Sequence, residues 1–163
     1  MSVRKNIKKT TLNQYTKDYV FDEKSHIRKT ADGRMYLPAV YCHNGHKLMT
    51  DDARFDGLRG VKLLVKADKS REIIVVSPFL DDQRKEGANF PEGTHLQICC
   101  PTCQEELEKL IPCTCGYGAY RRALYLTPNP KDMGAIGVCD TYGCPQSFIN
   151  EDGELLFMVE TEE

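Results

Sequence analysis

The sequence predicts a mostly β protein, built as two small antiparallel modules with one short helix between them. Short runs of β-branched and aromatic residues recur along the chain, and Gly, Pro, Asn and Asp separate these runs. Cysteine pairs bracket the runs in each half of the chain. At 163 residues, the chain can form one domain or two small ones, each with a modest core.

Changes in composition divide the chain into three segments. Residues 1–34 are polar, basic and poorly periodic, which predicts a flexible arm. From residue 35 the composition becomes apolar and β-prone, and we place the first module at residues 35–111. The second module is expected at residues 112–163, which end in an acidic stretch.

Within the first module, two apolar segments predict a β-hairpin. Residues 61–66 and 72–76 are rich in Val, Ile and Leu, and a short polar segment separates them. A loop rich in Asp, Gly, Asn and Pro follows, and residues 94–98 then predict a third strand that leads into two cysteines. The hairpin is therefore an insert between the cysteine-containing ends of the module.

A helix is expected over residues 102–111. Thr102 and Glu105 match a helix capping box, and Leu107 and Leu110 contribute to an apolar side. Pro112 would end this helix.

The second module is predicted to be a β meander. Turn-forming residues and a cysteine pair separate its β-prone segments. These segments cover residues 120–127, 135–139, 146–149 and 154–159.

Overall composition favours a soluble protein of the cytoplasm. The hydrophobic fraction is 40% and the charged fraction 28%, which is ordinary for globular proteins. The apolar runs, such as residues 73–76, are far too short to cross a membrane, and the first residues lead into no signal-like hydrophobic region. Because reducing compartments keep thiols free, we interpret the eight cysteines chiefly as metal ligands.

The first ligand constellation joins two distant turns. Cys42 and His46 form one pair, and Cys100 and Cys103 form a C-x2-C turn after the inserted hairpin. Thiolate sulfur and imidazole nitrogen are the donors that a tetrahedral zinc ion prefers. We assign these four residues to a first zinc site, with His43 as the rival to His46.

The second constellation consists of four cysteines around a predicted hairpin. Cys113 and Cys115 precede it, and Cys139 and Cys144 follow it. Closure of the hairpin would bring four thiolates together, so we expect a second zinc ion, although four thiolates can also hold iron. Cys99 remains outside both sets and is expected to be a buried apolar residue.

These constellations resemble those of zinc-ribbon proteins, in which two ligand turns at the tips of β-hairpins hold one zinc ion. The resemblance covers residues 41–149 as two successive units. Its most specific parts are C-x-N-G-H-x-L at residues 42–48 and C-P-T-C at residues 100–103, which are similar to turns of small bacterial zinc-ribbon proteins. The chain departs from the pattern in its long insert and in the C-x-C and C-x4-C spacings of the second set. The resemblance implies structural zinc and no particular activity.

We expect the chain to be a protein-binding or assembly module, such as a small subunit of a larger complex, rather than an enzyme. The sequence contains no Gly-rich phosphate loop, no H-E-x-x-H motif and no nucleophile beside a base. A less favoured class is an iron-thiolate redox protein, because four thiolates can also hold iron, or a zinc enzyme subunit. The zinc enzyme would require an open coordination position at the first site, which exists only if His46 is not a ligand.

The alternative function is nucleic-acid binding. Aromatic rings stack on bases and cationic side chains neutralise phosphates, and the second module offers both kinds of residue. The net charge of -2 opposes this interpretation. The residues concerned are Tyr117, Tyr120, Arg121, Arg122 and Tyr125 of the second module, together with Arg4, Lys5, Lys8 and Lys9 of the arm.

Overall fold

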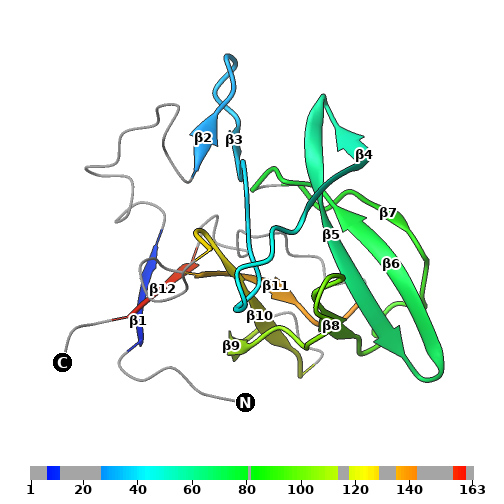
Figure 1. Cartoon of the computed structure of the whole chain (residues 1–163). Coiled ribbons are helices and arrows are strands. Elements are labelled where there is room, and N and C mark those ends of the chain that lie inside the picture. Colours follow the sequence, from blue (N-terminus) through cyan, green and yellow to red (C-terminus); the bar gives the residue numbers. More distant parts are fainter. Residues whose placement is uncertain are drawn as a thin grey trace.

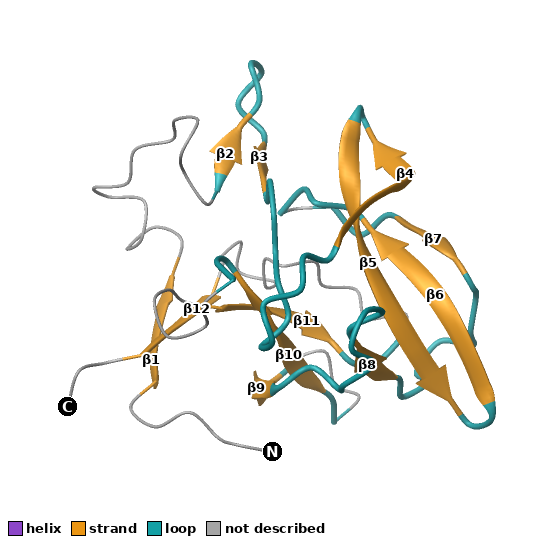
Figure 2. Cartoon of the chain, viewed as in Figure 1, coloured by secondary structure: helices purple, strands orange, loops and turns teal. Residues whose placement is uncertain are grey.

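The computed structural model describes residues 7–11, 27–80, 82–113, 118–128, 135–142 and 156–160. Within these ranges every regular element is a β-strand (Figure 2), so none of the described residues forms a helix long and apolar enough to cross a membrane. The prediction of a mostly β chain with antiparallel sheets is confirmed. The strands are β1 (Ile7–Thr11), β2 (Arg28–Lys29), β3 (Met35–Tyr36), β4 (Met49–Phe55), β5 (Leu58–Ala67), β6 (Ser70–Val76), β7 (Lys85–Gly87), β8 (Gln97–Cys99), β9 (Lys109–Pro112), β10 (Tyr120–Tyr125), β11 (Ala135–Cys139) and β12 (Leu156–Glu160).

Strands β4 to β8 form one antiparallel sheet, which we call the hairpin sheet. Its centre is the predicted hairpin: β5 and β6 pair without a break from Val61↔Val76 to Ala67↔Ser70. The turn between them includes Asp68 at a φ of 52°, a left-handed conformation that aspartate adopts more readily than most residues. Strand β8 pairs with the second half of β5 and so returns the chain to the centre of the sheet.

The second sheet, which we call the terminal sheet, has the order β1-β12-β11-β10-β9 (Figure 1). Strands β10 and β11 correspond to the predicted segments 120–127 and 135–139, and β12 overlaps the segment predicted at 154–159. The segment predicted at 146–149 lies outside the described residues. The described strands of the second module, β10 to β12, therefore pair in sequence order, as expected for the predicted β meander.

One apolar cluster joins the two sheets. Leu63 and Ile74 of the hairpin sheet belong to the same buried cluster as Leu124 and Ile136 of the terminal sheet. The main chain adds to this contact, because Leu96 donates its N–H to the carbonyl oxygen of residue 140 at 2.7 Å. The two sheets therefore pack against each other around a shared core.

The predicted helix at residues 102–111 is wrong. The N–H of Thr102 donates to a cysteine sulfur, and Glu105 closes the cysteine turn through its main chain, so neither residue caps a helix. Leu107 is fully buried in the core cluster, whereas Leu110 packs on a separate cluster with residues of β10. Pairing of β9 with β10 keeps this segment extended, and its position at the sheet edge tolerates Pro112, which has no N–H to donate.

Contacts cross the predicted segment boundaries. The boundary between residues 111 and 112 falls inside β9, and the shared core includes residues from both predicted modules. In the predicted arm, β1 pairs with β12, and Ile27 is fully buried in the core. The flexibility of the arm and the division into two modules stay predictions.

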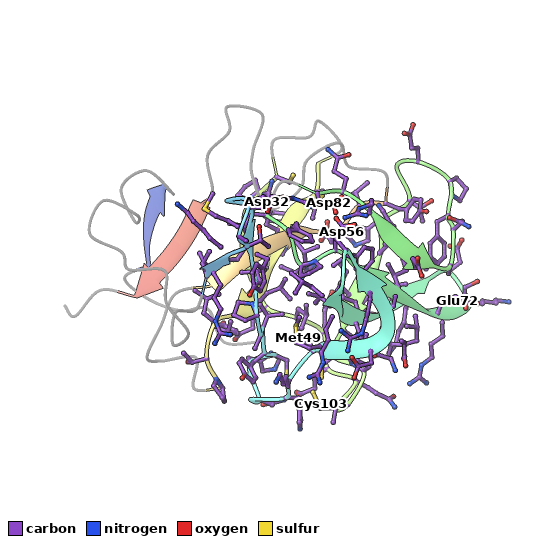
Figure 3. All side chains as sticks on the ribbon, turned by 90° about the horizontal axis from the view of Figure 1, so that it is seen from above. Asp32, Met49, Asp56, Glu72, Asp82 and Cys103 are labelled. Carbon is purple, nitrogen blue, oxygen red and sulfur yellow. The ribbon has the colours of Figure 1, made fainter. Side chains whose placement is uncertain are left out.

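A partly exposed ionic cluster connects loops at the side of the molecule away from Cys103 (Figure 3). Arg84 binds Asp56 at 2.7 Å and Asp82 at 2.7 Å, and Arg34 binds Asp56 at 2.8 Å. Hydrogen bonds from Arg84 and then from Arg34 lower the pKa of Asp56 to about 2. These contacts connect the β2–β3 turn, the β4–β5 turn and the loop after β6.

Candidate metal centre

The first ligand turn runs from Cys42 to His46. Two main-chain hydrogen bonds close it, from Cys42 N to His46 O at 3.0 Å and from Gly45 N to Cys42 O at 2.9 Å. Asn44 donates its backbone N–H to the Cys42 sulfur at 3.4 Å. Gly45 has a φ of 84°, and a Cβ there would stand 3.0 Å from the carbonyl oxygen of Pro128. Glycine therefore satisfies both the left-handed turn and the close packing.

The second ligand turn follows β8 and is built in a similar way. The carbonyl oxygen of Cys100 accepts a hydrogen bond from Gln104 N at 2.8 Å, and the N–H of Cys100 donates to Glu105 O at 3.0 Å. Thr102 donates its N–H to the Cys100 sulfur at 3.4 Å. Gln104, directly after Cys103, has a φ of 63°, which turns the chain sharply behind the ligand.

The two turns bring four donor atoms together. The sulfurs of Cys42, Cys100 and Cys103 and a ring nitrogen of His46 all lie within 4.8 Å of one another. Zinc–sulfur bonds of about 2.3 Å in a tetrahedron place neighbouring ligands roughly 3.8 Å apart. In agreement with this spacing, His46 Nδ1 is 3.5 Å from the Cys42 sulfur. The set therefore fits a tetrahedral ion, and three thiolates with one imidazole are typical of zinc.

His43, the rival to His46, lies outside the donor cluster. Its Nε2 lies 3.7 Å from a carboxylate oxygen of Glu105. Its Nδ1 is buried and has no hydrogen-bond partner among the described residues. The structure thus brings His46 to the three cysteines, as the sequence predicted, and places His43 beside the second turn.

Burial and hydrogen bonding give Cys42 and Cys103 of the cluster different thiol pKa values. Burial raises the pKa of the Cys42 thiol to about 11. Burial also acts to raise the pKa of Cys103, but hydrogen bonds from the Asn44 side chain and the Glu105 backbone outweigh it and lower this pKa to about 7. Zinc binding therefore displaces a proton more readily from Cys103 than from Cys42.

The metal centre is attached to both sheets. Tyr41 exchanges two main-chain hydrogen bonds with Tyr125 of β10, at 2.8 and 2.9 Å, so the first turn extends from the terminal sheet (Figure 1). The second turn continues directly from β8 of the hairpin sheet, which pairs with β5. The whole hairpin sheet lies in the sequence between the two ligand turns. The beginning and the end of the chain segment that forms the hairpin sheet therefore meet at the donor cluster.

The second predicted cysteine set is described only in part. Cys113 follows β9 and donates its N–H to Ala119 O at 2.8 Å, and Cys139 ends β11 opposite Arg121. Both cysteines thus lie beside the beginning of β10, one on each side of it. The remaining two members, Cys115 and Cys144, lie outside the described residues.

The two arginines of the second module proposed to contact nucleic acid are buried. Arg121 is 5% exposed and lies over Gly137, whose carbonyl oxygen accepts a hydrogen bond from it at 3.1 Å. Arg122 is 6% exposed and donates to the fully buried Asp140 at 3.1 Å. Tyr125 is also buried, at 1% exposure. These three side chains are therefore part of the interior.

The two other tyrosines of that group differ from Tyr125. Tyr120 is partly exposed at the start of β10, and the ammonium group of Lys109 lies 4.0 Å from the centre of its ring. Tyr117 lies outside the described residues. Among the described residues of this second-module group, only the Tyr120 ring is therefore open to solvent, and it already contacts a cation of the neighbouring strand.

The Arg122 ion pair is a buried polar site that the sequence did not predict. Asp140 accepts hydrogen bonds from Arg122 at 3.1 Å and from the backbone of Tyr120 at 3.0 Å. Arg122 also donates to Leu107 O at 3.3 Å and lies 3.4 Å from Glu106. No local sequence signal links these residues, because their partners come from different strands and turns.

Cys99 and His95 lie near the two sites without joining the donor cluster. Cys99 is 1% exposed, and burial raises the pKa of its thiol, in agreement with its predicted role as a buried apolar residue. The His95 side chain is 68% exposed, with Nδ1 3.8 Å from Asp140. Neither residue belongs to the group of four donors.

Comparison of the chain with models of protein families, with curated proteins and with solved structures gave no match. The chemistry of this centre is therefore assigned from its donors and their arrangement.

Proposed function

We propose that this chain is a structural zinc protein with ligand turns of the zinc-ribbon kind. The observation that carries the proposal is the convergence of three cysteine sulfurs and the His46 ring nitrogen within 4.8 Å. Four protein donors fill a tetrahedron and leave no position for a water molecule or a substrate, as in structural sites. The ion would supply folding free energy by holding the two turns together.

We further propose that the folded chain acts in the cytoplasm as a protein-binding or assembly module. A closed zinc site favours a structural role over catalysis. The apolar cavity between the sheets, lined in part by Leu63, Ile98 and Val138, has a volume of about 60 Å³. Small-molecule sites usually have volumes of about 300–1,000 Å³, so this cavity is too small for an ordinary substrate. Among the described residues, the closed donor set and this small cavity are the observations that support recognition of a protein partner through the outer surface.

A second zinc ion is part of this proposal. Cys113 and Cys139 lie on either side of the beginning of β10, where a metal ion could join β9 to β11 through them. Cys115 and Cys144 would supply the other two ligands. Four thiolates around one ion again form a closed structural site.

Metal analysis of the full chain, purified without chelator, tests the zinc proposal. We expect two zinc ions per chain, because thiolate donors at this spacing bind zinc tightly and release protons on binding. Native mass spectrometry of the same sample reports the metal, its stoichiometry and any stable protein partner in one measurement. A folded, fully reduced chain that contains no zinc would refute the proposal.

Binding to single-stranded RNA or DNA separates the assembly module from the alternative function. We expect negligible binding even at about 50 mM salt, because Arg121 and Arg122 are buried and cannot reach phosphate. The positive charge of residues 1–34 is offset by the acidic residues at 151–163. Fluorescence anisotropy with labelled oligonucleotides at about 50 and 200 mM salt measures the binding. Tight binding that weakens steeply with salt would instead support a nucleic-acid-binding protein.

A further inference from the structure

The side chain of Asn44 reaches from the first ligand turn to the second. Its Nδ2 lies 3.5 Å from the sulfur of Cys103 and also contacts the Glu105 carboxylate. Both acceptors are on the second turn, whereas the backbone N–H of Asn44 donates to Cys42 on its own turn. One residue therefore contacts a sulfur donor of each turn.

The chemistry of the asparagine amide suits this position. An amide nitrogen carries two N–H donors, and here it meets two acceptors, a cysteine sulfur and a carboxylate oxygen. Hydrogen bonds to a charged acceptor are roughly twice as strong as those between neutral groups. Aspartate has nearly the same shape but carries no donor when ionised, so it would place a negative charge against Cys103 and Glu105.

Glu105 completes the contact on the outer side of the centre. Its carboxylate accepts from Asn44 and lies 3.7 Å from Nε2 of His43. Both partners belong to the first turn, although Glu105 follows the last cysteine of the second. The side chains of Asn44, Glu105 and His43 therefore form a bridge between the turns that does not use the metal donors themselves.

We propose that Asn44 and Glu105 are positioning residues that hold the Cys103 sulfur in the zinc site and slow the release of the ion. This inference rests on the proposed zinc site. Cys103 is the cysteine of the cluster that needs such support, because it is partly exposed, whereas Cys42 and Cys100 are buried. Partners that orient metal ligands typically change metal affinity by about 10- to 100-fold when they are replaced.

The test compares Asn44→Asp with wild type and with Asn89→Asp, all as full-length, zinc-loaded chains. Asn89→Asp is a matched control, because it adds the same charge at an exposed position outside the metal centre, where the side-chain oxygen still accepts from the Tyr142 hydroxyl. We expect zinc transfer to a chromogenic chelator to be about 10- to 100-fold faster for Asn44→Asp and unchanged for Asn89→Asp. Alkylation mapped by mass spectrometry should modify Cys103 before the buried cysteines.

A second variant, Glu105→Gln, tests the bridge with little risk to folding, because the Glu105 side chain is 59% exposed. Its amide oxygen still accepts from Asn44 but carries no charge. We therefore expect zinc release to be faster than in the control and slower than in Asn44→Asp. This order of the three zinc release rates would support the bridge between the two turns.

Two results would overturn the positioning role while the zinc site itself stands. One is a rate of zinc release that is the same in the wild type, in Asn44→Asp and in Glu105→Gln. The other is equal alkylation of Cys42, Cys100 and Cys103 in the Asn44→Asp chain, which would indicate general unfolding. If the wild-type chain binds no zinc, the proposed function fails first and the inference fails with it.

Discussion

Replacement of Cys100 by serine is expected to abolish metal binding at the first site and to destabilise the whole chain. Cys100 is fully buried in the core cluster and continues from β8, so its loss removes a donor and disrupts the join between the two turns. Loss of a structural metal is among the few changes that cost more than about 4–5 kcal/mol. For a chain of this size, that corresponds to a fall in the thermal unfolding midpoint on the order of 10–20 °C.

The neighbouring residue provides a matched control for this prediction. Cys99→Ser removes a thiol that is also buried but lies outside the donor cluster. Zinc content measured by mass spectrometry should fall by one ion in Cys100→Ser and stay at the wild-type value in Cys99→Ser. Loss of metal from both variants, or from neither, would contradict the ligand assignment.

Replacement of Asp140 by alanine is expected to cost about 3–5 kcal/mol of the free energy of unfolding, because it leaves Arg122 buried without its closest counterion. Asp140 is fully buried, and Arg122 is 6% exposed. Glu106, at 3.4 Å from Arg122, keeps part of the ion pairing and moves the expected cost to the lower end of this range. Urea unfolding followed by circular dichroism measures the change.

A double-mutant cycle separates the ion pair from simple loss of packing. Arg122→Met keeps much of the aliphatic volume and removes the charge that Asp140→Ala would leave unpaired. We expect the double variant to be more stable than the sum of the two single changes predicts, because removal of both charges avoids the cost of one buried alone. Additive effects would show that the pair contributes no specific coupling.

The parts of the molecule that could be predicted from the sequence are those that local signals determine. Each ligand turn has its donors and turn-forming residues within a few positions, and the structure brings Cys42, His46, Cys100 and Cys103 together. The β5–β6 hairpin is equally local, since two apolar runs flank one polar turn. In these segments, residue pattern and tertiary structure favour the same conformation.

The segment at residues 102–111 shows why the predicted helix is wrong. Leu107 and Leu110 are spaced as on one helical side, yet the structure buries them in two different clusters. Pairing with β10 and closure of the ligand turn decide its conformation. The pairing depends on residues beyond the next turn of the chain, and it outweighs a modest local preference for helix.

The burial of Arg121 and Arg122 could not be predicted from the sequence, for a similar reason. On a strand with alternating sides, at least one of two adjacent arginines is expected to face solvent. Here Arg121 lies along Gly137, a residue without a side chain, and Arg122 meets Asp140. These partners lie on or beyond the next strand, so residue type alone suggested a binding surface where the structure has an interior.

The position of the ligand turns has a consequence for the unfolded chain. A single ion held by both turns closes a loop that contains the entire hairpin sheet. Closing a loop of this length removes chain entropy equivalent to roughly 4 kcal/mol on the scale used for disulfide cross-links. The terminal sheet can then unfold locally while β4 to β8 stay in one closed loop, because the ion binds donors at both ends of that segment. The zinc ion would thus act as a reversible cross-link, present only while its four donors stay together.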